Sequence, residues 1–437
     1  MSSGLALRRL ESLPLRGMRL GLEAIDAVCG RLGRPERRVR SILIAGTNGK
    51  GSTAATLSAI ARAAGVRAGL YTSPHLVDVT ERIRVDDEDV SRGELDEALA
   101  PVFAAADAAP EMPLTYFEAM TAAAFVAFAS RRLDLAVLEV GLGGRFDATN
   151  VAPAAVSVVT SIGLDHTAEL GATRPLIARE KAGIFRNGRP ALVRAADADA
   201  REALRDAAAA AGAVWHDALE ELGVEVERVS LEGTRFHLRT PQGSAARALT
   251  TPLPGAHQAW NAALAVRAAE LLDGGRPLLS HGSAVSAGVA RVRWAGRLER
   301  RTLEGRDLLL DGCHNVEGAE ALARFLSDAG LERKCPLVFG AMADKDVEGI
   351  AATLFPLAAA VYLAPAPSDR AASVADLARR VATVRPDAVP AESLADALAR
   401  ARRLPGHDPI IVAGSLYLVG EAEALLLAAE GHAPQNA

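Results

Sequence analysis

The chain has 437 residues, half of them hydrophobic (50%), and carries a formal net charge of −5. That length exceeds a single typical core, so we expect two domains, and the slightly acidic balance gives no indication of binding to nucleic acid or to a membrane. The three scattered cysteines exclude a disulfide framework and a metal–thiolate site. No apolar run has the length of a membrane span or forms a signal-peptide core, so we expect a cytoplasmic protein.

The N-terminal part of the sequence predicts helix and then a strand–loop–helix unit. Residues 1 to about 40 are expected to be helical, because apolar side chains recur at three- and four-residue spacing between residues 22 and 32. Residues 41–52 then read Ser-Ile-Leu-Ile-Ala-Gly-Thr-Asn-Gly-Lys-Gly-Ser, and an alanine-rich helical pattern continues to residue 64. A strand, a glycine-rich turn and a helix N-terminus in this order are typical of a triphosphate site.

The residues of this loop suit phosphate binding one by one. Gly46, Gly49 and Gly51 allow backbone N–H groups to close around phosphate oxygens, Lys50 can reach the terminal phosphates, and the Ser52 hydroxyl can bind Mg²⁺. The spacing departs from G-x-x-x-x-G-K-[ST], because the first glycine is missing and an extra glycine separates lysine from serine. A glycine-rich turn that binds nothing is the alternative. We disfavour it because lysine, serine and three glycines coincide with the expected flanking pattern.

Further along, strands alternate with helices and end in polar residues. Strands are expected at residues 66–71, 135–140 and 156–162, and helices at 115–130 and 195–213. This rhythm predicts a mainly parallel, doubly wound sheet, in which ligands bind beyond the carboxyl ends of the strands. The polar groups at these ends are Thr72-Ser73-Pro74-His75, Glu139 and Asp165-His166.

The character of the sequence changes twice after residue 220. Alternating residues between 224 and 249 predict a small antiparallel appendage. Residues 294–300 mark the expected domain boundary, and the βα rhythm restarts with strands at 307–310, 336–339, 360–364 and 409–412. We therefore expect one domain over residues 1–296 and a second, smaller nucleotide-fold-like domain over 297–437.

Several of these polar residues could take part in catalysis, and each also has a plainer interpretation. Glu139 suits coordination of Mg²⁺, although a strand-end carboxylate is often a satisfied structural group. His166 and Lys181 gain interest only because they converge with Glu139 on the strand ends of one predicted sheet. Asp311-Gly312-Cys313-His314-Asn315 could reach a nucleotide across an interdomain cleft or could form a simple turn, and the residues alone leave both open. Neither a nucleophile triad nor a dinucleotide fingerprint is supported.

Taken together, these segments resemble the folylpolyglutamate synthase/dihydrofolate synthase family, a branch of the Mur ligase superfamily. The resemblance covers nearly the whole chain. It is carried by residues 45–52, Thr72-Ser-Pro-His-Leu76 with Glu81-Arg82-Ile83, 138–150, Asp165-His166, Glu180-Lys-Ala-Gly183, 257–262, 296–299, 344–346 and 414–420. Two departures, Cys313 with Val316 in one motif and Ala295 in another, affect loop backbone rather than reacting groups.

The resemblance implies a P-loop ATPase domain of Mur ligase type with a mainly parallel sheet, a smaller Rossmann-like C-terminal α/β domain, and roles for particular residues. Catalysis is implied for Lys50, His166 and Lys181, the last of which matches a position that is often a carbamylated lysine in the family. ATP binding is implied for Gly46, Thr47, Asn48, Gly49, Lys50, Gly51, Ser52, Asn261, Arg297, Asp311 and His314. Two Mg²⁺ ions are implied, held by Ser52, Ser73, Glu139 and His166. Substrate contacts are implied for Phe117, Asp147, Arg82 and Ser415, and Phe117 and Asp147 match positions that hold the pterin.

The implied reaction is ATP-dependent ligation of L-glutamate to a folate-type acceptor through an acyl phosphate. Dihydropteroate, tetrahydrofolates or both are open as acceptors, and Phe117 and Asp147 favour both. A Mur-type ligase acting on a nucleotide-sugar peptide and a nucleotide-binding regulator without ligase activity are the alternatives. A monomer is expected, since members of the family are usually monomeric.

Overall fold

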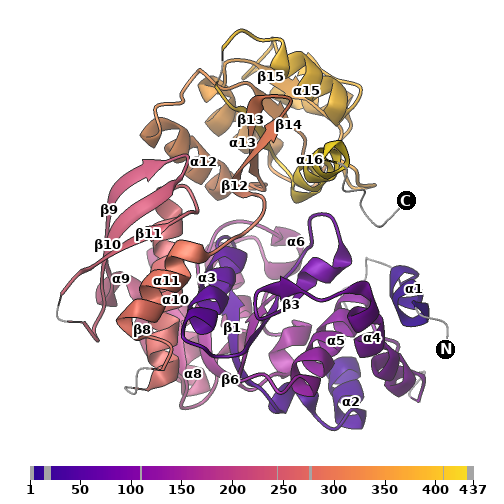
Figure 1. Ribbon diagram of the computed structural model, residues 1–437, viewed down its shortest axis with the longest axis vertical. Helices are drawn as coiled ribbons and strands as arrows, with labels where there is room; N and C mark the ends of the chain where they lie inside the picture. Colours follow the sequence, from indigo (N-terminus) through magenta and orange to yellow (C-terminus); the bar gives the residue numbers. More distant parts are fainter. Residues whose placement is uncertain are drawn as a thin grey trace.

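A computed structural model describes residues 4–13, 21–108, 111–243, 245–274, 278–406 and 408–430. It contains two large sheets with helices on both faces and a small three-stranded sheet (Figure 1). In the part of the chain that is described, no helix is long and apolar enough to cross a membrane. The prediction of a mainly parallel sheet with a second, smaller α/β unit is confirmed.

The first sheet has eight strands in the order β4-β3-β2-β5-β1-β6-β7-β8. Its parallel strands are β1 (Arg40–Ala45), β2 (Ala68–Tyr71), β5 (Leu135–Glu139), β6 (Ala154–Val159), β7 (Pro190–Val193) and β8 (Val214–Asp217). The edge strands β3 (Ile83–Val85) and β4 (Glu88–Asp89) run antiparallel. Because the central strands are parallel, their carboxyl ends meet at one edge, and the loops that follow them share that edge.

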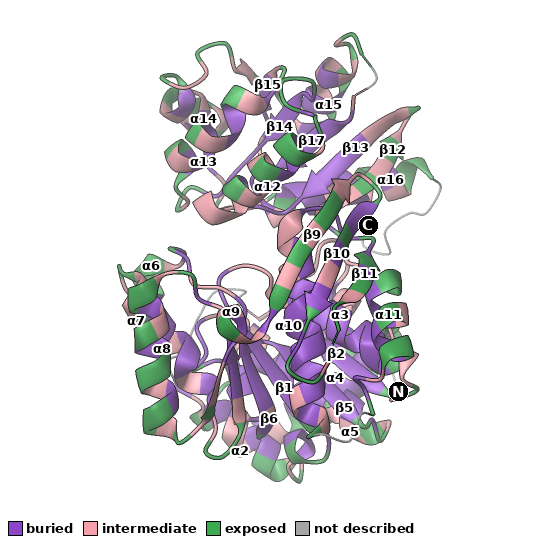
Figure 2. Cartoon of the chain, turned by 90° about the vertical axis from the view of Figure 1, so that its left-hand side faces the viewer, coloured by how far each residue is buried: buried purple, intermediate pink, exposed green. Residues whose placement is uncertain are grey.

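Helices cover both faces of this sheet because its central strands are apolar on both sides. In β1, Ile42 and Ile44 face one core while Leu43 and Ala45 face the other. The first core is closed by α3 (Lys50–Ala63), α10 (Ala256–Asp273) and α11 (Gly282–Arg291), and the second by α1 (Leu5–Glu11), α2 (Glu23–Arg31), α4 (Arg92–Asp107), α5 (Tyr116–Ser130) and α8 (Ala198–Ala211). Figure 2 shows the strands between them as a buried band.

The appendage expected after residue 220 is an antiparallel sheet in the order β11-β10-β9. It comprises β9 (Gly223–Ser230), β10 (Gly233–Arg239) and β11 (Arg247–Thr251). Strand β9 contacts α10 below it and α12 (Val316–Asp328) above it, so this sheet lies along the side of both larger units (Figure 1).

The second large sheet has six strands in the order β12-β13-β17-β14-β15-β16. Strand β12 (Arg297–Leu303) is antiparallel to β13 (Arg306–Asp311), and β17 (Ile410–Ala413), β14 (Leu337–Phe339), β15 (Val361–Leu363) and β16 (Val389–Pro390) continue in parallel. Helices α12, α13 (Val347–Leu354) and α14 (Val374–Val381) cover one face, and α15 (Leu394–Arg402) and α16 (Leu416–Ala429) cover the other.

Some expected elements differ in the structure. The first forty residues are not one helical region: two short helices precede a 3₁₀ turn (Pro35–Arg37), β1 already begins at Arg40, and residues 14–20 lie outside the described residues. Strands β3, β4, β7, β8, β12 and β16 were not predicted. The segment expected as a boundary contains the start of β12, whose first residue, Arg297, pairs with Asp311 of β13.

Candidate active site

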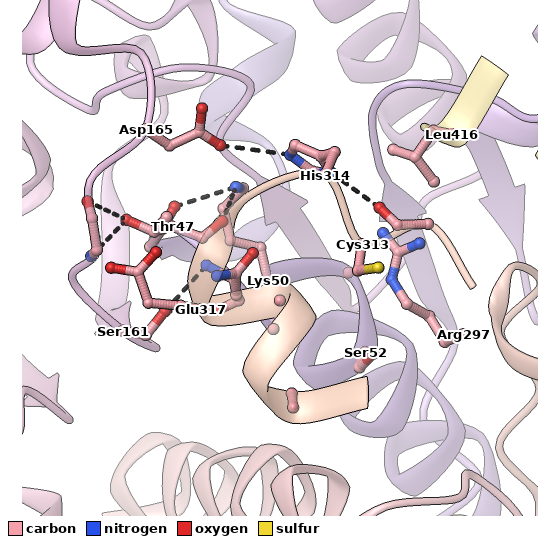
Figure 3. Close-up of a pocket in the computed structure, with 18 of the residues that line it drawn as sticks. Thr47, Lys50, Ser52, Ser161, Asp165, Arg297, Cys313, His314, Glu317 and Leu416 are labelled. Carbon is pink, nitrogen blue, oxygen red and sulfur yellow. Dashed lines mark hydrogen bonds and ion pairs between the residues drawn. The ribbon is translucent and has the colours of Figure 1, made fainter. Parts of the chain in front are cut away.

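A cavity of about 470 Å³ lies between the two large sheets. Its lower wall is formed by the loops that follow β1, β5 and β6, and its upper wall by the loops that follow β13 and β17. Figure 3 shows side chains from both walls pointing toward one another. Of the predicted strand-end groups, Ser73, Pro74, Glu139, Asp165 and His166 therefore meet at this cavity, whereas Thr72 and His75 do not line it.

The phosphate loop runs from Gly46 to the first turn of α3. Gly46 and Gly49 have φ angles of +149° and +85°, which favour glycine, and Gly49 forms the N-cap of α3. The space is also tight, since a Cβ on Gly46 would lie 2.0 Å from Oγ1 of Thr160. Because the N–H groups of a helix's first turn have no partner within the helix, this loop presents donors and a positive dipole end to the cavity.

Gly51, the residue that breaks the usual loop spacing, has a packing reason of its own. A Cβ at this position would lie 2.8 Å from the indole of Trp294, which rests on the first turn of α3. The glycine between lysine and serine thus gives room to an aromatic ring from the segment that precedes β12.

Two lysines of the lower wall turn toward the same backbone. The Nζ of Lys50 donates to the carbonyl oxygens of Gly46 (3.0 Å) and Thr47 (3.1 Å), and the Nζ of Lys181 donates to the Gly46 oxygen at 2.9 Å. Burial lowers the pKa of Lys181 to about 7, and the charge of Lys50 adds to that effect. Burial also lowers the pKa of Lys50, against the opposing charges of Glu139 and Asp165.

The residues proposed for metal binding gather beside Lys50. Glu139 accepts a hydrogen bond from the Ser73 N–H at 3.2 Å, and burial raises its pKa although Lys50 opposes this. His166 has a left-handed backbone (φ 51°), and burial lowers the pKa of its imidazole to about 4, so it is neutral and able to donate a lone pair.

This set fits Mg²⁺ better than a metal that needs a full protein cage. Among the described residues no group of three or more His, Cys, Asp or Glu side chains could hold an ion. One carboxylate, one imidazole and the hydroxyls of Ser52 and Ser73 suit an ion that keeps water and phosphate oxygens as ligands.

Asp165 joins the two walls. Its carboxylate accepts hydrogen bonds from Lys345 Nζ and from Asn315 Nδ2 (3.0 Å), and it lies 3.3 Å from Nε2 of His314, all three from the upper wall. Burial alone would raise its pKa, but the hydrogen bond and charge of His314 and the charge of Lys345 hold the pKa well below its usual range. Asn315 also exchanges hydrogen bonds of 3.1 Å with Asn48 of the phosphate loop.

The upper wall also contains three more of the residues implied for ATP and substrate, Asp311, Arg297 and Ser415. Asp311 accepts hydrogen bonds from the N–H groups of Leu298 and Cys313, both at 3.0 Å, and burial raises the pKa of its carboxyl. Arg297 and Ser415 line the cavity beside it, and Ser415 caps α16. From the lower wall, Asn261 lies so close to Gly49 that a Cβ there would be 2.4 Å from its Oδ1.

Three expected substrate residues lie elsewhere. The walls of the cavity, as far as the chain is described, do not include Arg82, Phe117 or Asp147. The Nε of Arg82 donates to Nδ1 of His75 at 2.9 Å, and its guanidinium lies 5.3 Å from the centre of the Tyr116 ring.

Phe117 and Asp147 lie directly behind the loop at residues 141–142, which does line the cavity. A Cβ on Gly141 would lie 2.6 Å from Phe117, and Asp147 accepts the Leu142 N–H at 2.9 Å and the Thr149 N–H at 3.0 Å. Burial raises the pKa of Asp147. The assignment of Phe117 and Asp147 to the acceptor therefore stays a prediction.

Sequence reasoning gave no role to Asp165, Asn315, Lys345 or Trp294. Asp165 and Lys345 stand in motifs that were recognised, but only the packing of the two units brings them together. For Trp294 the sequence offered no indication.

Comparison with known proteins identifies relatives over almost the whole chain. The Mur ligase middle domain matches residues 44–269, and the glutamate ligase domain of Mur ligases matches residues 296–416. The chain is 35% identical to the dihydrofolate synthase/folylpolyglutamate synthase of Escherichia coli over 413 residues, which cover 94% of the chain and 93% of that protein.

Solved structures give the same result. The Mycobacterium tuberculosis folylpolyglutamate synthase complexed with ADP superposes with a TM-score of 0.88, at 34% identity and 98% coverage of both chains. A bifunctional folylpolyglutamate synthase/dihydrofolate synthase with Mn, AMPPNP and L-glutamate bound superposes with a TM-score of 0.83, at 32% identity, covering 99% of this chain and 98% of that one.

Proposed function

The chain belongs to the dihydrofolate synthase/folylpolyglutamate synthase family of Mur ligases, and we propose that it joins L-glutamate to both dihydropteroate and tetrahydrofolate at the expense of ATP. One observation carries the proposal. A single cavity has a phosphate loop with Lys50 and Ser52 on one wall and the loop from Asp311 to His314 on the other. A ligase needs such an arrangement, because a nucleotide and an amine must meet one carboxylate.

The first chemical step is phosphoryl transfer. A carboxylate oxygen of the acceptor attacks the γ-phosphorus of ATP, the bond to the β-phosphate oxygen breaks, and an acyl phosphate and ADP result. The N–H groups of the phosphate loop and the Nζ of Lys50 neutralise the charge of the transferring group. To do so, Lys50 must exchange its bonds with the Gly46 and Thr47 carbonyls for bonds to phosphate oxygens.

Ser52, Ser73, Glu139 and His166 are the residues that would hold Mg²⁺. Bound there, the ion would supply positive charge to the phosphate oxygens. Burial keeps His166 neutral, as a ligand requires, and the Ser73 N–H fixes one oxygen of Glu139.

The second step forms the amide. The amino group of L-glutamate attacks the acyl carbon, and the tetrahedral intermediate collapses with loss of phosphate. Asn261, Arg297, Asp311 and His314 would hold the nucleotide, with Ser415 at the substrate. Because acyl phosphates hydrolyse, water must be kept out, and the contacts of Asp165 with His314, Asn315 and Lys345 hold the two walls together.

Carbamylation of Lys181 is part of the proposal. Only a neutral amine adds to CO₂, and burial brings the pKa of Lys181 to about 7, so a large fraction of the amine is neutral near neutral pH. The product is an anion, which would attract Lys50 instead of repelling it.

The proposal also covers the domain division, the oligomeric state and the cellular compartment. We assign the ATPase part to residues 1–296 and the glutamate ligase part to 297–437. We expect a monomer. The three cysteines are all free and buried, which fits a reducing, cytoplasmic compartment. Light scattering after size-exclusion chromatography tests the monomer.

Release of ADP by the purified protein with Mg-ATP and L-glutamate tests the function. Turnover with dihydropteroate and with tetrahydrofolate is the expected result. Turnover with one acceptor would reduce the assignment to a single activity, and no turnover with either, while ATP still binds, would point to another Mur-type acceptor.

A further inference from the structure

A narrow crevice of about 40 Å³ opens from the cavity at the side of Ser73 and Glu139. It shares these two residues, Pro74, Arg297 and Leu416 with the main cavity, and its other lining residues include Arg84 and Trp294. A space of this size takes a group of a few heavy atoms, such as a carboxylate, but not an aromatic ring system.

Arg84 is held at the wall of the crevice by two contacts. Its guanidinium lies 5.2 Å from the centre of the Trp294 ring, and its Nε donates to Oδ1 of Asp89 at 2.6 Å. Within the described part of the chain the Asp89 bond is the only hydrogen bond of the Arg84 side chain. Stacking on an indole leaves the remaining N–H groups in the plane of the guanidinium, where they can bind a carboxylate in a bidentate manner.

The position of Trp294 fixes this arginine relative to the phosphates. The indole rests on Gly51, one residue from the proposed Mg²⁺ ligand Ser52, and the side chain of Arg84 is only 20% exposed. Arg84 is therefore a largely buried cation above the Trp294 ring and beside the phosphate loop, and the reaction steps described above give it no role.

The acidic residues of the crevice do not satisfy Arg84. Glu81 accepts hydrogen bonds from three backbone N–H groups, those of Leu76, Val77 and Asp78, and so stabilises its own loop. Glu139 faces Ser73 and Lys50. A further anion at this point would have Arg84 on one side and Arg297 on the other.

We propose that Arg84 binds the α-carboxylate of the terminal glutamyl residue of the acceptor while the γ-carboxylate of that residue reacts at Lys50. The inference rests on the proposed function, since it names a subsite within that reaction. A glutamyl residue carries two carboxylates three carbons apart, and the crevice joins the cavity at the proposed metal ligands. One carboxylate can therefore occupy the crevice while the other meets the phosphate.

The two proposed acceptors differ in just this group. Tetrahydrofolate ends in a glutamyl residue with an α-carboxylate, whereas the only carboxylate of dihydropteroate is the one that reacts. Arg84 would thus serve polyglutamate synthesis and leave dihydrofolate synthesis almost untouched.

The experiment measures kcat and KM of Arg84→Ala for both acceptors, with Mg-ATP and L-glutamate saturating. Since a hydrogen-bonded ion pair to a carboxylate is lost, KM for tetrahydrofolate should rise about tenfold or more, while KM for dihydropteroate should change less than about twofold. Arg84→Lys, which keeps the charge but not the planar fork, should restore part of the loss. Arg67→Ala removes an exposed arginine that pairs with Asp86 outside the crevice and serves as the matched control.

A structural role would give a different pattern. If Arg84 acted only by tying β3 to β4 through Asp89, Asp89→Asn would reproduce the loss and both acceptors would suffer alike, which overturns the proposal. Unchanged KM for tetrahydrofolate in Arg84→Ala also overturns it. If the unaltered protein turns over neither acceptor, the proposed function itself fails, and the subsite fails with it.

Discussion

The two walls of the cleft are built in different ways. On the lower wall the reactive groups are held by other residues of the same unit: Lys50 and Lys181 turn to the Gly46 carbonyl, and Glu139 accepts the Ser73 N–H. On the upper wall His314, Asn315 and Lys345 are held by Asp165, a residue of the opposite wall. The groups of the lower wall are thus held within one unit. The contacts that join the two units instead centre on the buried carboxylate of Asp165, and the Asn48–Asn315 hydrogen bonds and the contacts of Glu317 add to them.

The largest effect is expected at Lys50, because in the proposed reaction this side chain contacts the transferring phosphoryl group directly. Lys50→Ala should lower kcat by roughly 10³-fold, since one fixed donor to the transferring phosphoryl group is lost. ADP release measures the loss. The thermal unfolding temperature should not fall, because the variant removes a buried cation whose pKa is lowered by burial. Near-normal turnover would show that this wall has another phosphate-binding cation.

Lys181 tests whether the lower wall needs a modified lysine. Lys181→Ala should reduce kcat by roughly 10²-fold, because without the anion on Lys181 the ammonium group of Lys50 would be misplaced relative to the phosphates. A short carboxylic acid such as acetate should restore part of the activity, because it replaces the carbamate anion. Mass spectrometry of the intact protein under native conditions should show the mass of one added CO₂.

The pH dependence of this modification has a definite sign. The pKa of Lys181 is lowered to about 7, so below that pH the amine is protonated and does not add to CO₂. Activity in CO₂-depleted buffer should therefore recover on addition of bicarbonate above pH 7 and recover poorly below it. Activity that ignores bicarbonate at every pH would contradict carbamylation.

Asp165 tests the dependence of the upper wall on the lower one. Asp165→Asn keeps the shape but leaves Lys345 and His314 without their anion, so KM for L-glutamate should rise roughly ten- to hundredfold with a smaller change in KM for ATP. In the double variant Asp165→Asn/Lys345→Met, the loss of glutamate binding should be smaller than the sum of the losses in the two single variants, since both remove the same interaction.

The charge state of Asp165 should not limit the enzyme at ordinary pH. Its pKa in the folded protein is held below the unfolded value, so its stabilising effect is present above the usual carboxyl range and is lost only as the pH falls through the lowered value.

An equal rise in KM for ATP and for glutamate in Asp165→Asn would show that Asp165 supports the whole cavity rather than the approach of one wall.

The sequence predicts the features that lie within one unit better than the contacts between the two units. The strand, loop and helix around Lys50 are adjacent in the chain, so their residue types and spacing were sufficient to predict this unit, which the structure places at the wall of the cavity. Lys345 lies 180 residues from Asp165, and no local pattern contains that contact. Strands β3 and β4 were missed because they are short and charged, and the stacking of Trp294 on Gly51 depends on how the chain returns to α3.

The smallest effect is expected at Arg174, at the exposed edge of the contact between the two walls. Arg174 Nη2 and the Leu164 N–H contact Glu317 at 3.1 and 3.2 Å, and the arginine side chain is 39% exposed. Because an exposed ion pair contributes little, Arg174→Ala should change KM for L-glutamate by no more than about twofold, and high salt should remove even that difference. Steady-state kinetics at low and high ionic strength measure it. An effect as large as that of Asp165→Asn would mean that the contacts between the two walls contribute about equally, and the contrast between a wall held within its own unit and a wall held chiefly by the Asp165 carboxylate would no longer stand.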